Sequence, residues 1–332
     1  MSRKLLPISF TAALIGGTAA ADAPSVAVDI TPVHSLVARV MEGVGTPNLV
    51  IPAGASPHHY SLKPSEAKAL QDSDVVFWMG EDLAPWLQDA VETLADDADV
   101  TALLEADGTV LHEFREDALF EKHDHGDEEH GHEDEHGHDE HAEKQHDHEE
   151  DHDEHAHDEH GHGAHDPHAW LSPSNAAAWL DLIAAELSAA DPDNASAYFA
   201  NAAAGRAEME AMSAEVNEIL APVRGGSFVV FHDAYQYFEK DFNVPASGAI
   251  SFSDASDPSP ARIAEIQGRV RDEGIECVLA EPQFNPGIVA TILDGTKANT
   301  AVIDPLGAEL ELGPNLYPQL IRNMATTLAG CL

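Results

Sequence analysis

The sequence is poor in basic residues, and this shortage limits the classes of partner. Its 332 residues include 16 Lys or Arg against 60 Asp or Glu, a formal net charge of −44 at pH 7. A surface this acidic argues against nucleic acid and anionic lipid as partners, and it favours cations. The hydrophobic content of 43% is that of an ordinary globular protein, and the length allows two core-bearing domains.

Long apolar runs are also missing, because no stretch approaches the 18 residues of a membrane-spanning helix. The N-terminus has Arg3 and Lys4, then the mostly apolar Leu5–Ile15 and the small residues of Gly16–Ala21. This order is typical of a secretory signal peptide, which we place at residues 1–21. No cysteine lies near the cleavage site to carry a lipid. We therefore expect a soluble protein, exported to a bacterial periplasm without a direct membrane anchor.

Cysteine is scarce, since only Cys277 and Cys331 are present. In an oxidising compartment an even pair is more simply a structural disulfide than a redox or metal site. Two unpaired buried thiols are the alternative. The sequence has no CxxC pair, so its two cysteines form no local zinc-binding signature.

Histidine and carboxylate, by contrast, are concentrated in one segment. Between Glu121 and Asp166 there are 15 His and 20 Asp or Glu against two Lys, a net charge of −18, and no large apolar residue. Such a segment buries too little surface to offset the entropy of ordering it, so we predict a mobile loop over residues 121–165. Imidazoles bind borderline-soft divalent metals, and carboxylates attract cations. The expected low-affinity metal-binding residues are His123, His125, His130, His132, His136, His138, His141, His146, His148, His152, His155, His157, His160, His162 and His165.

Short apolar strands alternate with helices in both halves of the chain, which predicts βα units and mainly parallel sheets. The expected strands are Ser25–Ile30, Asn48–Ile51, Asp74–Met79, Ser227–Phe231, Glu276–Ala280 and Thr300–Ile303. The expected helices are Thr31–Gly43 with Thr31 as N-cap, Pro64–Leu70, Ala84–Leu94, Ser172–Ala189 with Ser172 as N-cap, Pro260–Glu273, Pro286–Gly295 and Tyr317–Leu328.

A longer periodic segment begins at Asp191-Pro192 and predicts a helix of roughly 28 residues. Its expected apolar face is Ala195, Tyr198, Phe199, Ala202, Met209, Met212, Val216 and Ile219. We predict an α/β fold with two lobes, each a mainly parallel sheet flanked by helices, joined by this helix as a rigid spine. The expected parts are an N-terminal lobe (22–190), the spine (191–224) and a C-terminal lobe (225–332). In such folds ligands bind at the carboxyl ends of strands, here in the crevice between the lobes.

Candidate metal ligands lie at these strand ends. His58 and His59 follow the second predicted strand, His168 precedes the helix at 172, and His232 and Asp304 each come directly after a strand. The three single histidines are separated by 110 and 64 residues, so they form no local motif. Taken alone, a histidine after a strand is more often a capping or hydrogen-bonding residue. Their shared placement favours one crevice site that collects a ligand from each segment.

Five segments, in order, resemble the site motifs of the cluster A-I metal-binding proteins of ABC importers. They are Pro52–His58 with Tyr60–Ser65, Asp166–Pro173, Phe231–Tyr235 with Tyr237–Glu239, Ala280–Phe284, and Ile303–Gly307. The resemblance runs from about Val26 to the C-terminus. With the histidine-rich loop included, it is greatest to the zinc-binding members of that family.

This resemblance implies that His58, His168 and His232 ligate the metal. Manganese-binding relatives usually carry Glu at the third of these positions, and three imidazoles favour zinc, as ligand softness also predicts. The family also pairs cysteines at the positions of Cys277 and Cys331, which supports the disulfide.

The fourth ligand stays open at the sequence level. Some zinc-uptake members have a Glu directly before the first histidine, where this chain has Pro57. The fourth position then falls to Asp304 or a water, with His59 or a histidine of the loop as alternatives. His59 is equally well a residue behind the ligands or one facing solvent. Glu281 is expected to support a ligating histidine, unless it caps a helix or forms a salt bridge.

The resemblance implies a binding protein and not an enzyme. We expect it to capture Zn²⁺ as a monomer and to deliver the ion to an ABC permease and its ATPase in the inner membrane. The loop would gather, buffer or sense zinc, or be a tolerated insertion that binds metal only because it is rich in histidine. A periplasmic zinc store and a zinc hydrolase are the rival functions. The hydrolase would need Glu281 or Asp304 as general base, and no nucleophile or oxyanion motif accompanies them.

Overall fold

The computed structural model describes residues 23–115, 165–251 and 258–332. The expected signal peptide lies outside the described residues. So do all of the candidate loop histidines except His165. Within the described ranges, no helix is both long and apolar enough to cross a bilayer.

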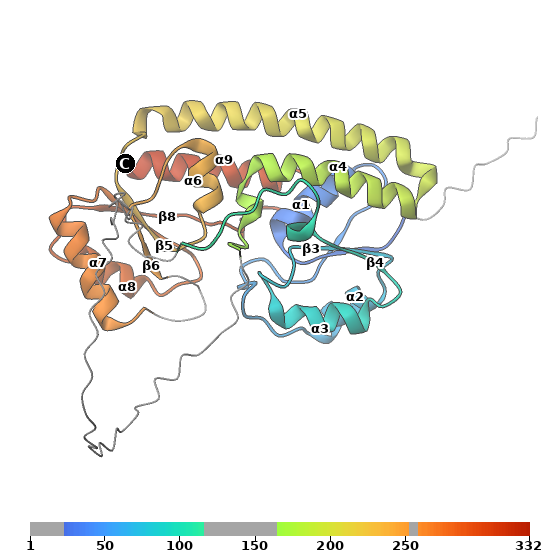
Figure 1. The fold of residues 1–332 in the computed structure, drawn as a ribbon, viewed down its shortest axis with the longest axis horizontal. Helices are drawn as coiled ribbons and strands as arrows, with labels where there is room; N and C mark the ends of the chain where they lie inside the picture. The colour runs from blue at the N-terminus through green and yellow to red at the C-terminus, as the bar shows by residue number, and fades with distance from the viewer. Residues whose placement is uncertain (1–22, 116–164, 252–257) are drawn as a thin grey trace, which may run out of the picture.

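The first sheet has four parallel strands in the order β2-β1-β3-β4. These strands are β1 (Val26–Val28), β2 (Asn48–Leu49), β3 (Val75–Trp78) and β4 (Asp99–Ala102). The two inner strands, β1 and β3, are apolar at every position and fully buried, as strands covered on both faces must be. On one side of this sheet lie α2 (Pro64–Gln71) and α3 (Pro85–Leu94), while α1 (Thr31–Val40) lies on the other (Figure 1).

The second sheet repeats this arrangement, with the order β6-β5-β7-β8 and parallel pairing throughout. Its strands are β5 (Phe228–His232), β6 (Ala249–Ser251), β7 (Cys277–Ala280) and β8 (Asn299–Val302). Its helices include α6 (Gln236–Phe242), α7 (Pro260–Asp272) and α8 (Pro286–Leu293). The predicted α/β fold with two mainly parallel sheets is therefore confirmed.

Three long helices form a common layer over the two sheets (Figure 1). They are α4 (Pro173–Ala190), α5 (Ala195–Leu220) and α9 (Leu316–Cys331). Helix α5 has 26 residues, about 39 Å at 1.5 Å per residue, and packs against α1, α4 and α9. One residue of its predicted apolar face is wrong, because Phe199 is 50% exposed while the neighbouring Tyr198 is fully buried.

The two Ser/Thr-Pro helix starts have different outcomes. The Ser172 hydroxyl caps α4 by accepting a hydrogen bond from the Asn175 N–H at 3.2 Å, as predicted. Thr31 is not the cap of α1, since it is already the first helical residue. Its hydroxyl instead donates to the Leu306 carbonyl oxygen of the second lobe, so an interlobe contact replaces the local one.

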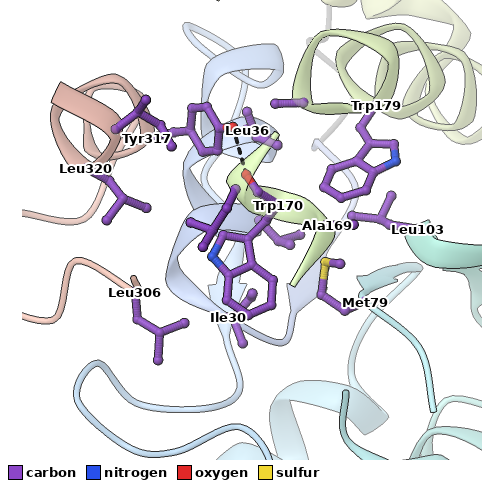
Figure 2. Close-up of a cluster of buried hydrophobic side chains, with 14 of the residues drawn as sticks. Ile30, Leu36, Met79, Leu103, Ala169, Trp170, Trp179, Leu306, Tyr317 and Leu320 are labelled. Carbon is purple, nitrogen blue, oxygen red and sulfur yellow. Dashed lines mark hydrogen bonds between the residues drawn. The ribbon is translucent and has the colours of Figure 1, made fainter. Parts of the chain in front are cut away.

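One apolar core runs through both lobes. It joins β1 and β3 of the first sheet to residues of β5 and β7 of the second, by way of α1, α4, α5 and α9. Trp170 lies at the junction between the lobes (Figure 2). Its Nε1–H donates to the Pro305 carbonyl oxygen at 2.9 Å, and its own carbonyl accepts from the Tyr317 hydroxyl at 2.7 Å. The lobes therefore share packed interior in addition to the spine helix.

Two further features complete the second lobe. A smaller, separate core that includes Val229, Phe231 and Ile266 is shared by the second sheet, α7 and α8. The disulfide Cys277–Cys331 ties the first residue of β7 to the last turn of α9. The predicted disulfide between the two cysteines is therefore confirmed.

Candidate metal centre

Three histidines from distant segments meet at the carboxyl ends of the strands. His58 lies in the loop that follows β2, His168 directly precedes the 3-10 turn Ala169–Leu171, and His232 is the last residue of β5. One ring nitrogen of each lies within 4.8 Å of the other two. Of the residues that the structure describes, these alone form a group of three or more potential metal-binding side chains.

The spacing of two of these nitrogens suits a shared ion. Nε2 of His58 and Nε2 of His168 are 3.3 Å apart. Two nitrogens bound to one tetrahedral zinc, at roughly 2.05 Å each, would be separated by about 3.3 Å. The ring centroids of His168 and His232 are 5.3 Å apart, the same as those of His58 and His168.

The loop that carries His58 is held against the helices of the first lobe. The Pro57 carbonyl accepts a hydrogen bond from the Trp86 indole N–H on α3 at 2.8 Å. Two residues beyond His58, the Tyr60 hydroxyl donates to Glu66 on α2 at 2.9 Å. His58 itself is half-buried, so it lies at the rim of the site.

His168 is oriented by the carboxylate two residues before it. Oδ1 of Asp166 accepts from both the His168 backbone N–H, at 3.0 Å, and the ring Nδ1, at 2.7 Å. With Nδ1 as the donor, the lone pair of Nε2 remains for a metal. Burial raises the pKa of Asp166 to about 6, although the His168 N–H bond acts in the opposite direction.

His232 has an equivalent carboxylate partner. Its Nδ1 lies 2.7 Å from Oε1 of Glu281, the residue after β7, and both side chains are almost completely buried. Glu281 thus contacts the ring in the way that a carboxylate supports a metal-binding imidazole. Two of the three rings therefore have a carboxylate on the far side from the shared space.

The other candidate site residues lie apart from this group. Asp304 accepts three backbone N–H bonds, from Leu306 and Gly307 at 2.9 Å each and from Ala308 at 2.6 Å. Its two oxygens therefore hold a turn. The His59 side chain is exposed. His165 forms an isolated antiparallel bridge with Glu113.

Sequence reasoning missed the polar network that joins the lobes beside His168 and His232. Gln236 on α6 donates through Nε2 to the Glu113 carbonyl at 3.0 Å and to Oδ2 of Asp166 at 3.3 Å. Arg115 forms salt bridges with Asp233 and Glu239, and burial raises the pKa of both carboxyl groups. A signal was present in the Asp166-Pro167-His168 sequence, because a carboxylate two residues before a histidine can reach the ring.

The chain matches a known family over nearly its whole length. The model of the family described as "Zinc-uptake complex component A periplasmic" matches residues 26–331. The high-affinity zinc uptake system protein ZnuA of Brucella abortus (strain 2308) is 47% identical over 327 residues, covering 98% of this chain and 97% of that protein. The protein of the same name from Paracoccus denitrificans (strain Pd 1222) is 44% identical over 331 residues, with 98% of each chain covered.

Solved structures share the fold. A crystal structure of ZnuA superposes with a TM-score of 0.71 at 22% identity, covering 93% of this chain and 99% of that one. A zinc-bound deletion mutant of ZnuA lacking residues 138–173 of its own numbering gives a TM-score of 0.70. With the family model and the close relatives in agreement, the chain belongs to the family of periplasmic A components of zinc-uptake complexes.

Proposed function

We propose that this chain binds one Zn²⁺ between His58, His168 and His232 in the periplasm and delivers it to the permease of an ABC importer. The observation that carries the proposal is the convergence of the three ring nitrogens within 4.8 Å of one another. Family membership supports it, because the relatives are named as proteins of a high-affinity zinc uptake system. The permease and its ATPase are the partners that this role requires.

The donor set supports zinc as the ion. Three imidazole nitrogens form a borderline-soft site that suits Zn²⁺ better than Mn²⁺ or Mg²⁺, which prefer oxygen. Asp166 and Glu281 each accept from a ring Nδ1, so they fix the tautomer and make the opposite nitrogen a stronger donor. We infer that water fills the fourth position, since both oxygens of Asp304 already hold backbone N–H groups.

Capture and carriage involve no turnover in this proposal. The lobes comprise residues 22–190 and 225–332, with the spine at 191–224, and the monomer is the working unit. Because one core runs through both lobes, release would come from rearrangement of the loop that bears His58 and from contact with the permease. The histidine-rich residues 121–165 would gather zinc at lower affinity.

A chelator-competition titration tests the site assignment. In a variant that lacks residues 116–164, we expect one tightly bound zinc to remain. In that background His58→Ala, His168→Ala and His232→Ala should each weaken binding at least about 100-fold. The control is His59→Ala, which removes an exposed neighbouring imidazole and should leave the affinity unchanged. Tight binding that survives all three substitutions would refute the assignment.

Transport itself needs a cellular test. A strain that lacks its own zinc-uptake binding protein should grow in zinc-depleted medium when it expresses the wild-type chain. The same strain should fail to grow with the triple alanine variant, and added zinc should restore growth. Equal growth with both chains would contradict the role in uptake.

A further inference from the structure

Two buried polar atoms behind His232 lack a hydrogen bond of good geometry. They are the Tyr235 hydroxyl and Oε2 of Glu281, in side chains that are 2% and 3% exposed. Unsatisfied buried polar atoms are costly and uncommon, so a pair at one place calls for an explanation. Oε1 of the same Glu281 holds the ring of His232.

The two atoms are suited to each other as donor and acceptor. Burial raises the pKa of Tyr235 well above its ordinary value, and the nearby Glu281 carboxylate raises it further. The phenol therefore keeps its proton and can donate to the carboxylate. Tyr235 follows His232 by three residues, directly after a turn in which the Ala234 N–H donates to the His232 carbonyl at 2.9 Å. The ring centroids of Tyr235 and His232 are 6.2 Å apart.

The arrangement around His168 indicates what the missing bond would complete. There the supporting carboxylate uses both of its oxygens, because Oδ1 of Asp166 holds the ring and Oδ2 accepts from Gln236. Around His232, Oε1 of Glu281 holds the ring, and Oε2 has no hydrogen bond of good geometry although the Tyr235 hydroxyl is close to this carboxylate. Tyr235 and Gln236 are adjacent at the start of α6, so consecutive residues face the two supporting carboxylates.

We infer that Tyr235 is a positioning residue of the zinc site, an inference that rests on the proposed function. When the ion binds Nε2 of His232, the Tyr235 hydroxyl donates to Oε2 of Glu281 and fixes that carboxylate. The fixed carboxylate keeps the Nδ1–H of His232 in place, so that Nε2 stays directed at the ion. A metal at Nε2 makes Nδ1–H a stronger donor, which is why this bond matters most in the loaded protein.

Tyr235→Phe removes the hydroxyl and little else. We expect zinc affinity to fall about tenfold, the lower end of the range for partners of metal-binding histidines. The unfolding temperature of the metal-free protein should not fall, because the Tyr235 hydroxyl has no hydrogen bond of good geometry to lose. The visible spectrum of the Co²⁺-loaded variant should also change, since it reports ligand geometry.

Tyr198→Phe is the matched control. It too removes a buried tyrosine hydroxyl that faces a carboxylate, since the Tyr198 hydroxyl donates to Asp191 at 2.9 Å, but it lies outside the metal centre. This variant should melt at a lower temperature and keep both wild-type zinc affinity and the Co²⁺ spectrum. If Tyr235→Phe loses zinc affinity and Tyr198→Phe loses thermal stability, the effect of Tyr235 on the zinc site is distinct from a general effect on stability.

A double-mutant cycle tests whether Tyr235 acts through Glu281. In a Glu281→Gln background the carboxylate is gone, so Tyr235→Phe should change zinc affinity by less than about twofold. Wild-type affinity and an unchanged Co²⁺ spectrum in Tyr235→Phe would overturn the inference. The same tenfold loss in both backgrounds would also overturn it. Neither result would touch the proposed function, which is tested separately by the alanine substitutions of His58, His168 and His232.

Discussion

Asp29 shows how strongly burial acts on a single carboxyl group in this fold. Its oxygens accept the N–H groups of Ile30 at 2.8 Å and Met79 at 2.7 Å, so it joins the end of β1 to the end of β3. The side chain is 1% exposed, and burial raises its pKa to about 7 in spite of those bonds. The folded protein therefore holds this proton more tightly than the unfolded chain, whose ordinary pKa is 3.8.

The first prediction follows from the raised pKa of Asp29 in the folded protein. The contribution of Asp29 to stability is fully present below pH 4 and is lost as the pH rises to about 7. We compare the free energy of unfolding of metal-free wild type with that of Asp29→Asn by urea denaturation. The difference should decrease as the pH rises from 4 to about 7. The exposed Asp89→Asn is the control and should show no such trend against wild type. A difference between wild type and Asp29→Asn that is independent of pH would contradict the prediction.

A second prediction concerns the role of Asp304. Asp304→Asn keeps one oxygen that can hold the turn but loses the acceptor for the Ala308 N–H. We expect a loss of about 1 kcal/mol in unfolding free energy and a zinc affinity within about threefold of wild type. Urea denaturation and chelator competition measure the two effects. A zinc affinity reduced about 100-fold would instead identify Asp304 as the fourth ligand.

At the scale of elements, the disulfide gives a third prediction. It joins β7 to the last turn of α9 across 54 residues, for which loop-closure entropy predicts about 4 kcal/mol of stabilisation. Replacing both Cys277 and Cys331 by Ala should lower the unfolding free energy by about 2–4 kcal/mol. Zinc affinity at 25 °C should stay near wild type, because neither residue is part of the candidate metal centre. Unchanged stability would show that packing alone holds α9 in place.

The elements also show where sequence patterns suffice. Strands β1, β3, β5 and β7 were predicted because a buried parallel strand is a short, continuous apolar run. Edge strand β4 was missed because two of its four residues are exposed and only Val100 is a large apolar residue. Strand β6 was missed because its Ala-Ile-Ser run is too short to give a pattern.

The candidate metal centre also has residues that the sequence predicts and contacts that it does not. His58 and His232 were predicted from their places after strands, His168 from its place before the helix at Ser172, and all three from the family resemblance. The contact of Gln236 with Asp166 and the approach of Tyr235 to Glu281 were not predicted, because they depend on how the start of α6 meets segments more than 40 residues away in sequence. Local periodicity carries no information about such a meeting.

At the scale of the whole molecule, the shared core limits how far the lobes can separate. A wide opening would expose Trp170, which is 1% exposed between the lobes, and break its bonds to Pro305 and Tyr317. We therefore expect zinc-free and zinc-loaded protein, both without residues 116–164, to have the same radius of gyration in solution scattering. A clear decrease on loading would indicate hinge closure and contradict this prediction.

The root of the histidine-rich segment has a consequence for how this protein can change. Glu113 pairs with His165, the Asp166 N–H donates to the His112 carbonyl at 2.8 Å, and Arg115 is anchored to α6. These contacts fasten both ends of the segment without using any residue between 116 and 164. Evolution can therefore vary the histidine content of this insertion without retuning the centre three residues downstream. The same position offers protein engineers a place to graft a reporter domain.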